Sequence, residues 1–139
     1  MVIIHKKIVN TGFVNGLTID FNTSRIFWCD AKDKGNIWSA NLDGSGYGIV
    51  KRSVDHIFAI ASFGSYLFWT EWNHNAIYYG SKTGNDSVLL QAFPKIRDVQ
   101  NVFGLKIYTK LKQQGEYGFI KVLFHFYLVD ASDFVSLFF

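Results

Sequence analysis

The sequence predicts an all-β protein made of two copies of a four-stranded antiparallel unit, and three observations support this. Residues 25–38, RIFWCDAKDKGNIW, and residues 66–79, YLFWTEWNHNAIYY, share an order: Phe-Trp, a small residue, an acid, a polar loop, then Ile and an aromatic residue. Trp28 and Trp69 lie about 40 residues apart, which is the length of one propeller blade. Short runs of bulky or alternating residues are separated by turn signals, and no stretch before residue 110 has a helical period.

The first copy is expected to form a blade over residues 16–54. Leu17, Ile19 and Phe21 alternate with polar residues, as in a half-buried strand. The run around Trp28 is bulky on both faces, which is typical of a covered strand. Residues 37–42 and 48–54 supply two more strands, separated by the Asp-Gly-Ser-Gly turn at 43–46.

The second copy repeats this order and predicts a blade over residues 58–93. Its strands are expected at 58–63, 66–72, 76–81 and 87–93, with a Lys-Thr-Gly-Asn turn at 82–85. Residues 102–110 then resemble one further inner strand. The expected architecture is therefore two blades plus a closing strand.

Composition excludes several classes of protein. The chain has 139 residues, of which 49% are apolar and 18% aromatic, so a disordered chain is not expected. A net charge of +3 without a basic cluster argues against nucleic-acid binding. The single cysteine allows no internal disulfide. The apolar stretch at 117–129 is short for a membrane span and contains Lys121 and His125, and no signal-like apolar run follows Met1.

The repeated element resembles the YWTD element of the low-density lipoprotein receptor family, also called the LDL-receptor class B repeat. Its residues are Phe27, Trp28, Cys29 and Asp30 in the first copy and Phe68, Trp69, Thr70 and Glu71 in the second. The stretch HIFAIASFGSYLFWTEWN at 56–73 matches the blade pattern of that family closely. The resemblance implies a partial six-bladed YWTD β-propeller over residues 1–115, with 102–110 as the closing strand and 116–139 as an apolar tail outside the family pattern.

The chain departs from the family pattern at several places. Cys29 replaces Thr, Glu71 replaces Asp, and Phe27 and Phe68 replace Tyr. The cysteines of an EGF-like module do not follow Gly115. A thiol is a weaker hydrogen-bond donor than a hydroxyl, so a poorer local network is expected at Cys29.

The resemblance implies a non-catalytic, extracellular, protein-binding segment of a lipoprotein-receptor-like endocytic or signalling co-receptor. The alternative is an extracellular matrix or growth-factor-precursor protein, nidogen-like or EGF-precursor-like, which uses the same propeller. The expected partners are protein ligands, or neighbouring EGF-like and ligand-binding modules, and not nucleic acid. The expected location is the ectodomain of a single-pass membrane receptor, although the chain itself shows neither a signal peptide nor a membrane helix.

Enzyme, cofactor and metal functions are not expected. The four histidines lack metal-ligand spacing, and Asp30 beside Cys29 disfavours a reactive thiolate. Asp20, Asp30 and Glu71 could be a glycosidase carboxylate set, but the repeat accounts for Asp30 and Glu71 more simply. A propeller hydrolase would depend on inner-strand residues, of which Asp20, Ser62 and Lys106 are too few.

The loops of such blades alternate between two faces. The top face carries the 31–35, 55–57, 73–75 and 94–101 loops, and the bottom face carries 22–24, 43–46, 64–65 and 82–86. Candidate top-face residues for partner binding are Trp72, His74, Asn75, His56, Lys32, Lys34 and Arg97, with Trp72 as the anchor. Alternatively, Trp72 only packs on the neighbouring blade.

Two further features belong to these faces. The sequons at Asn22 and Asn85 are candidate N-glycosylation sites and both fall on the bottom face, which would leave the top free. His56 and His74 both fall on the top face, so a pH switch is one hypothesis and two solvated histidines are the other.

Overall fold

The protein is described here from a computed structural model. The structure describes residues 12–32, 35–52, 54–84 and 86–92, together with Gly104, Leu105, Ile107 and two short C-terminal strands. The described residues form two four-stranded antiparallel sheets and a two-stranded pair, and none of them is helical. The all-β fold class is confirmed. Most of the expected closing strand at 102–110, and most of the tail at 116–139, lie outside the described residues.

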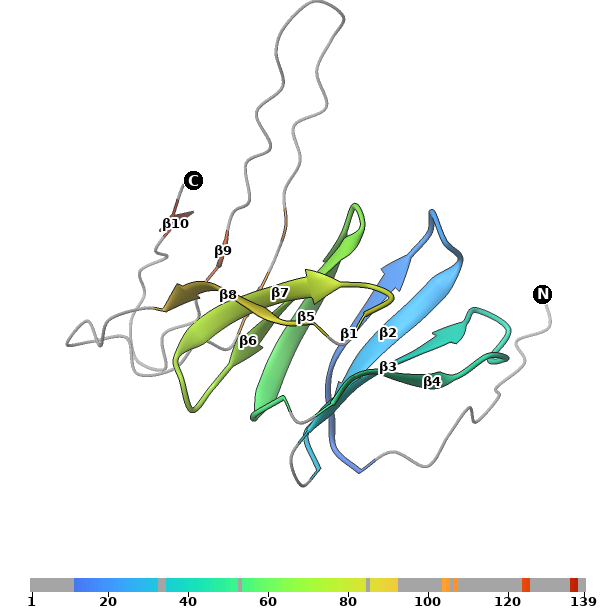
Figure 1. Cartoon of the computed structure of the whole chain (residues 1–139), viewed down its shortest axis with the longest axis horizontal. Helices are drawn as coiled ribbons and strands as arrows, with labels where there is room; N and C mark the ends of the chain where they lie inside the picture. Colours follow the sequence, from blue (N-terminus) through green and yellow to red (C-terminus); the bar gives the residue numbers. More distant parts are fainter. Residues whose placement is uncertain are drawn as a thin grey trace, which may run out of the picture.

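The first sheet is a simple meander in the order β1-β2-β3-β4 (Figure 1). Its strands are β1 (Val14–Asp20), β2 (Arg25–Asp30), β3 (Asn36–Asn41) and β4 (Gly48–Arg52). Trp28 on β2 lies opposite Leu17 on β1 and Trp38 on β3. A register shift near the start of β1 marks a bulge.

The second sheet repeats this arrangement in the order β5-β6-β7-β8. Its strands are β5 (Ile57–Phe63), β6 (Tyr66–Glu71), β7 (Ala76–Ser81) and β8 (Val88–Ala92). Trp69 lies opposite Ile60 and Tyr78, as Trp28 does with its partners, and the first strand again carries a register shift. The remaining strands, β9 (Phe124–His125) and β10 (Ser136–Leu137), pair with each other.

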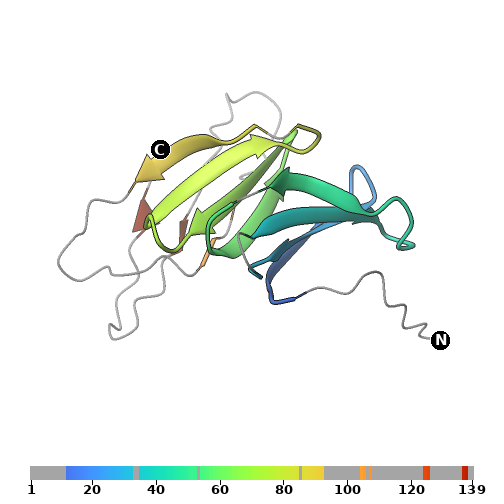
Figure 2. The same cartoon turned by 60° about the horizontal axis from the view of Figure 1, so that its bottom comes forward.

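The two sheets pack face to face, with the innermost strands β1 and β5 beside each other (Figures 1 and 2). The main core lies between them and contains Phe27, Cys29, Ile37, Val54, Ile57, Ile60, Leu67 and Trp69. Alternation explains this set, because Phe27 and Cys29 share one face of β2 while Trp28 occupies the other. Burial of these apolar side chains is the main force that holds the sheets together.

Two lysine–carboxylate contacts join the sheets at the bottom face. The Lys82 ammonium, after β7, lies 2.5 Å from Asp20 at the end of β1, and the buried Lys51 on β4 contacts Asp86 at 3.1 Å. Lys51 also donates to the Gly84 carbonyl, and Lys82 donates to the Gly64 carbonyl. The two sheets are therefore joined by charge-assisted bonds as well as by apolar packing.

No helix among the described residues has the length and apolar character needed to cross a membrane.

Candidate functional site

Asp30 ties the start of the first sheet together at the top end of β2. Its carboxylate accepts the backbone N–H groups of Gly12 at 2.8 Å, Phe13 at 2.9 Å and Lys32 at 3.0 Å. Burial alone would raise the pKa of Asp30, but these N–H donors and the nearby Lys32 charge hold it below its ordinary value. Asp30 therefore supports the backbone at the start of the first sheet.

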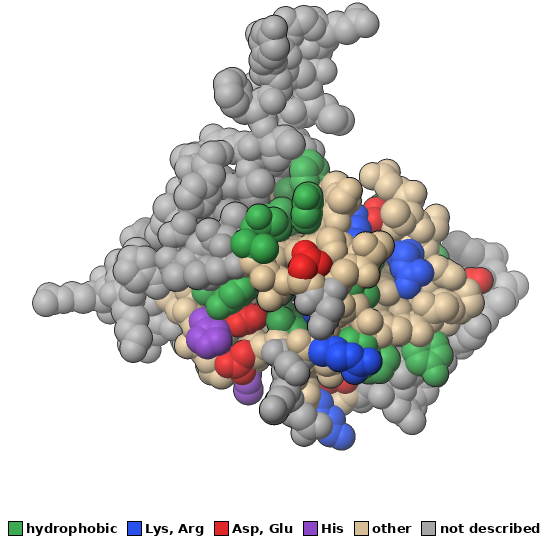
Figure 3. Space-filling view, in the orientation of Figure 1, with side chains coloured by type: hydrophobic (Ala, Val, Ile, Leu, Met, Phe, Trp, Pro, Cys, Tyr) green, Lys and Arg blue, Asp and Glu red, His purple; other side chains and the backbone are tan. Residues whose placement is uncertain are grey.

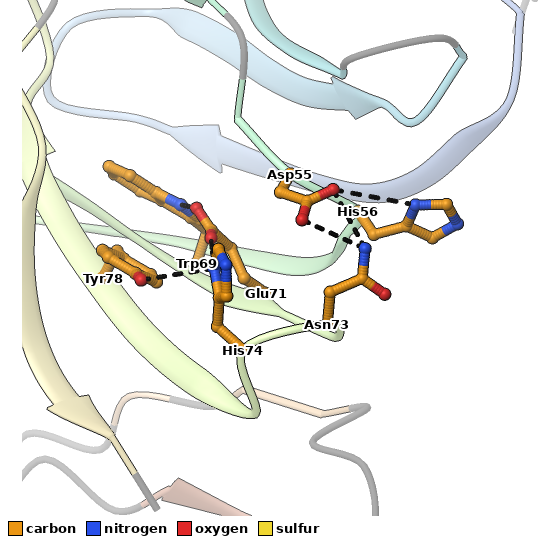
Figure 4. Close-up of polar contacts among 7 residues, drawn as sticks. All are labelled: Asp55, His56, Trp69, Glu71, Asn73, His74 and Tyr78. Carbon is orange, nitrogen blue, oxygen red and sulfur yellow. Dashed lines mark hydrogen bonds and ion pairs between the residues drawn. The ribbon is translucent and has the colours of Figure 1, made fainter.

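Glu71 holds the corresponding position on β6 but has different contacts (Figure 4). One carboxylate oxygen accepts the indole N–H of Trp69 at 3.1 Å, and the other lies 2.9 Å from Nδ1 of His74. Both Glu71 and Trp69 are buried. The extra methylene of glutamate lets the carboxylate turn back to the indole two residues earlier.

Trp28 differs from Trp69 both in place and in bonding. Trp69 lies in the core between the two sheets. Trp28 occupies the face of the first sheet that is turned away from the second sheet, where it stacks on Trp38 with ring centres 6.3 Å apart. Neither of these two indole N–H groups has a hydrogen-bond partner within the part of the chain that the structure describes.

Cys29 and Thr70 each contact the innermost strand of their own sheet, which carries a bulge. The Thr70 hydroxyl accepts the Ala59 N–H at 3.1 Å, whereas Cys29 Sγ contacts the Gly16 carbonyl at 3.4 Å. Burial raises the pKa of the Cys29 thiol to about 12, with a smaller contribution from the negative charge of Asp30. A thiol with that pKa is protonated at neutral pH and is a poor nucleophile.

The link between the sheets and the β6–β7 turn are joined by polar contacts on the top face (Figure 4). The Asn73 side-chain amide donates to both oxygens of Asp55, at 3.1 and 3.0 Å. His56 Nδ1 lies 4.0 Å from the same carboxylate, and its ring meets Trp72 edge-on with centres 5.8 Å apart. Trp72 remains 37% exposed, so an aromatic surface is presented to solvent on a fixed backbone.

His74 lies on the same top face, in the turn between β6 and β7. It is largely exposed, it faces Glu71, and the Tyr78 hydroxyl lies 3.5 Å from its ring nitrogen. Burial raises the pKa of Tyr78, and the negative charges of Glu71 and Asp55 act in the same direction. Figure 3 shows histidine side chains beside acidic ones at one side of the molecule, with lysine and arginine over the first sheet.

The structure separates the candidate binding residues into three groups. Trp72, His56, His74 and Lys32 are exposed. Asn75 is only 7% exposed and has a left-handed backbone (φ 47°), so it is a turn residue and not an accessible contact, which corrects the expectation. Lys34 and Arg97 lie outside the described residues.

The bottom face carries the first of the two sequons. Asn22 is exposed in the β1–β2 turn, while Asn85 lies outside the described residues. The turn is held by Asp20, which accepts the Asn22 backbone N–H at 3.1 Å and the Thr23 hydroxyl at 2.6 Å. An exposed asparagine in a turn is a suitable acceptor for a glycan.

Sequence reasoning missed Asp55, Asn73 and Tyr78 on the top face and the Lys51 and Lys82 contacts at the bottom. The partners of each lysine lie in other turns, so no local spacing indicates them. Asp55 and Asn73 did have a signal, because both fall in loops assigned to the same face and carry complementary polar groups.

Among the described residues, the candidate catalytic carboxylates do not come together and no metal-binding group is found. No group of three or more His, Cys, Asp or Glu side chains within them is placed to hold a metal ion. Asp20 lies at the bottom with Lys82, whereas Asp30 and Glu71 lie at the top ends of their strands, so these three carboxylates do not converge. Ser62 is half-buried on β5, and Lys106 lies outside the described residues.

Comparison with known proteins supports the all-β, propeller-like fold described above. No protein-family model matches the chain. Low-density lipoprotein receptor-related protein 5 from Homo sapiens is 38% identical over 81 residues, which are 58% of this chain and 5% of that protein. The same protein from Mus musculus is 39% identical over 81 residues, again 58% of this chain and 5% of the relative. Low-density lipoprotein receptor-related protein 4 from Mus musculus is 33% identical over 88 residues, 62% of this chain and 5% of the relative.

The two sheets are similar to YWTD repeats of the low-density lipoprotein receptor type. A solved structure titled "Crystal structure of Nidogen/Laminin Complex" matches with a TM-score of 0.53 and 24% identity, over 60% of this chain and 33% of that one. This likeness supports the fold, a partial β-propeller. The YWTD segment spans about 5% of the length of the curated relatives that it matches.

Proposed function

We propose that this YWTD segment is a non-catalytic, protein-binding part of an extracellular, lipoprotein-receptor-like endocytic or signalling co-receptor. Residues 1–115 are assigned to the propeller, with blades at about 16–54 and 58–93 and a closing strand at 102–110, and residues 116–139 to a separate tail. Three receptor-related relatives support the class of protein. The partners are protein ligands or neighbouring EGF-like and ligand-binding modules of a membrane-anchored parent.

The observation that carries the proposal is the arrangement around Trp72. Its ring is exposed, packs against His56, and stands on a backbone that the Asp55–Asn73 bonds hold in place. Exposed aromatic side chains with polar surroundings are frequent binding hot spots. Because these bonds already hold the cluster in place, its own side chains lose little conformational entropy when a partner binds.

Glycans at Asn22 and Asn85 would lie on the bottom face and leave the top face accessible. Asn22 is exposed, which supports the first of these sites. Glycopeptide mapping of the secreted chain tests this arrangement, and two unmodified asparagines would contradict it.

A comparison of aromatic variants tests the proposal. Biotinylated chain captures cell-surface and secreted proteins, which are quantified by mass spectrometry for wild type, Trp72→Ala and Tyr47→Ala. Tyr47 is a matched control, since it is an exposed aromatic residue of the bottom face. Trp72→Ala should weaken specific capture by about thirtyfold, as for a hot-spot residue. Equal losses in both variants, or none in Trp72→Ala, would contradict the assignment.

A pH response belongs to the same surface. His56 faces Asp55, and His74 faces Glu71 and Tyr78. Protonation of either histidine converts its contact into an ion pair, and protonation of His56 places positive charge beside Trp72. We therefore expect partner affinity to differ between pH 7.4 and pH 5.5, and to lose that difference in His56→Gln/His74→Gln. An affinity that does not change between these pH values would exclude the switch.

A further inference from the structure

We propose that a cleft between the two sheets, near the bottom face, binds an acidic side chain of a protein segment through Arg25. The cleft has a volume of about 390 Å³. Its polar lining includes Arg25, Lys82, Thr23, Ser39 and Thr83, and Phe27, Ile49 and Val50 supply apolar surface. This site is separate from the top-face cluster around Trp72.

The first argument is the state of Arg25. Its guanidinium donates to Asn41 Oδ1 at 3.0 Å, to the Ser39 hydroxyl at 2.6 Å and to the Gly46 carbonyl at 3.3 Å. All three acceptors are neutral, and no carboxylate of the described residues forms an ion pair with Arg25. Arg25 is thus oriented by neutral groups, and Asp20, the carboxylate opposite it in the β1–β2 pairing, is itself bound by Lys82.

The second argument is that the carboxylates of the bottom face are already engaged. Asp20 is bound by Lys82 and Thr23, Asp43 by the Ser45 hydroxyl and N–H, and Asp86 by Ser81 and Lys51. Among the described residues that line the cleft, two are cations and none is an acid. Since Lys82 is neutralised by Asp20, the uncompensated positive charge in the cleft is that of Arg25.

The third argument concerns the kind of anion. Two half-buried aliphatic side chains, Ile49 and Val50, border the charge, and the Phe27 ring is buried in the adjoining core. A glutamate or aspartate flanked by aliphatic residues matches both the charge and this apolar surface. A sulfated polysaccharide matches the charge alone and has no group for the apolar wall.

Gly48 offers a way to supply the missing charge from within the chain. It lines the cleft, and a Cβ added there meets no atom within 4 Å. Gly48→Glu therefore places a carboxylate in the cleft without a clash at the first atom. Gly48→Gln has the same size without the charge and is its control.

The probe is a fluorescein-labelled octapeptide with one glutamate between leucine and valine residues, together with its glutamine twin. Binding is measured by fluorescence anisotropy on the full, unglycosylated chain, so that no sugar on Asn22 shields the neighbouring Thr23. The glutamate peptide should bind at least about tenfold more tightly than its twin, which is typical of a charged hydrogen bond. Arg25→Gln and Gly48→Glu should each weaken binding by a similar factor, and Gly48→Glu should weaken it more than Gly48→Gln.

Several outcomes would overturn the proposal. These are equal binding of the two peptides, unchanged binding by a folded Arg25→Gln, or equal effects of Gly48→Glu and Gly48→Gln. Binding of a heparin hexasaccharide in place of the peptide would overturn it in favour of a polysaccharide. If Arg25→Gln fails to fold, the Gly48 pair decides. Trp72→Ala should leave peptide binding intact, so the cleft and the top-face function fail or succeed separately.

Discussion

Two residues at equivalent positions of the YWTD element have different contacts because their side chains differ by one methylene. Asp30 stays near its own strand and bonds backbone N–H groups, whereas Glu71 reaches the Trp69 indole and His74. The departure from the family pattern at Glu71 thus satisfies a buried donor. It also connects the core to the exposed histidine of the top face.

Glu71→Asp should destabilise the fold by about 2 kcal/mol, because the shorter side chain leaves the buried Trp69 N–H without its acceptor. Urea unfolding followed by tryptophan fluorescence measures this change. Glu71→Gln is the control, since it keeps the length and an acceptor oxygen and should retain most of the stability. If Glu71→Asp is as stable as wild type, the indole bond to Glu71 contributes nothing measurable.

At the scale of strands, the two sheets approach each other closely at Gly16 on β1. An added Cβ there would lie 3.0 Å from Cys29 Sγ, 3.0 Å from the Phe58 carbonyl oxygen and 3.1 Å from the Ile60 nitrogen. Two of these three atoms are backbone of the neighbouring sheet, so they cannot move aside independently of β5.

Gly16→Ala should therefore destabilise the protein by about 2 kcal/mol through overpacking between the sheets. Gly48→Ala is the matched control, because Gly48 is also a strand glycine and its added Cβ meets no atom within 4 Å. The free energies of unfolding of both variants are compared by urea denaturation. Equal stability of the two variants would show that β1 and β5 can separate slightly without loss.

The strands themselves could be predicted from the sequence, but their contacts with each other could not. Alternation around Trp28 and Trp69, with turn signals between runs, was enough to indicate two four-stranded units, because those signals are local. The placement of Trp28 outside the junction depends on which face of β2 meets the second sheet. The Lys51 and Lys82 contacts depend on turns about 30 or more residues away.

In the candidate site, too, some features could be predicted from the sequence and others could not. Exposure of Trp72, His56 and His74 followed from loop positions that alternate between two faces. The burial of Asn75 did not, because its left-handed turn conformation gives no signal apart from the residue type itself.

For the molecule as a whole, the polar contacts between the sheets predict a dependence of stability on pH. Burial would raise the pKa of Asp20, but bonds from Lys82 and Thr23 bring it below its ordinary value. A carboxyl group of this kind stabilises the fold above its unfolded pKa of 3.8, and this contribution is lost as the pH falls through the lower folded pKa.

Asp20→Asn should cost about 3 kcal/mol at pH 7, because it leaves the Lys82 ammonium without its charged partner. It should also flatten the decline in stability below about pH 4. Asp30 and Asp86 also have lowered pKa values, so part of the decline should remain. Unfolding is measured in urea from pH 2.5 to 7. A parallel pH profile in wild type and Asp20→Asn would contradict the assignment to this contact.

The first sheet presents an apolar face away from the second sheet, and this face predicts self-association. Leu17 is 55% exposed and Ile19 is 40% exposed on this face, beside the stacked Trp28 and Trp38. Their alternation partners, Gly16 and Asp20, point to the second sheet, so the two apolar side chains cannot turn into the core. A propeller blade normally covers such a face with another blade. The same surface on a second copy of the chain is a ready substitute.

Leu17→Thr/Ile19→Thr should weaken association by at least about tenfold, since each apolar side chain withdrawn from an interface is worth roughly 1.5–3 kcal/mol. Sedimentation velocity over a concentration series measures the change, with Tyr47→Thr as a control that removes exposed apolar surface elsewhere. Emission from Trp38, which is half-buried, should shift with concentration in wild type and not in the double variant. A wild-type chain that stays monomeric throughout would show that this face needs no cover. Equal association of all three proteins would place the contact on another surface.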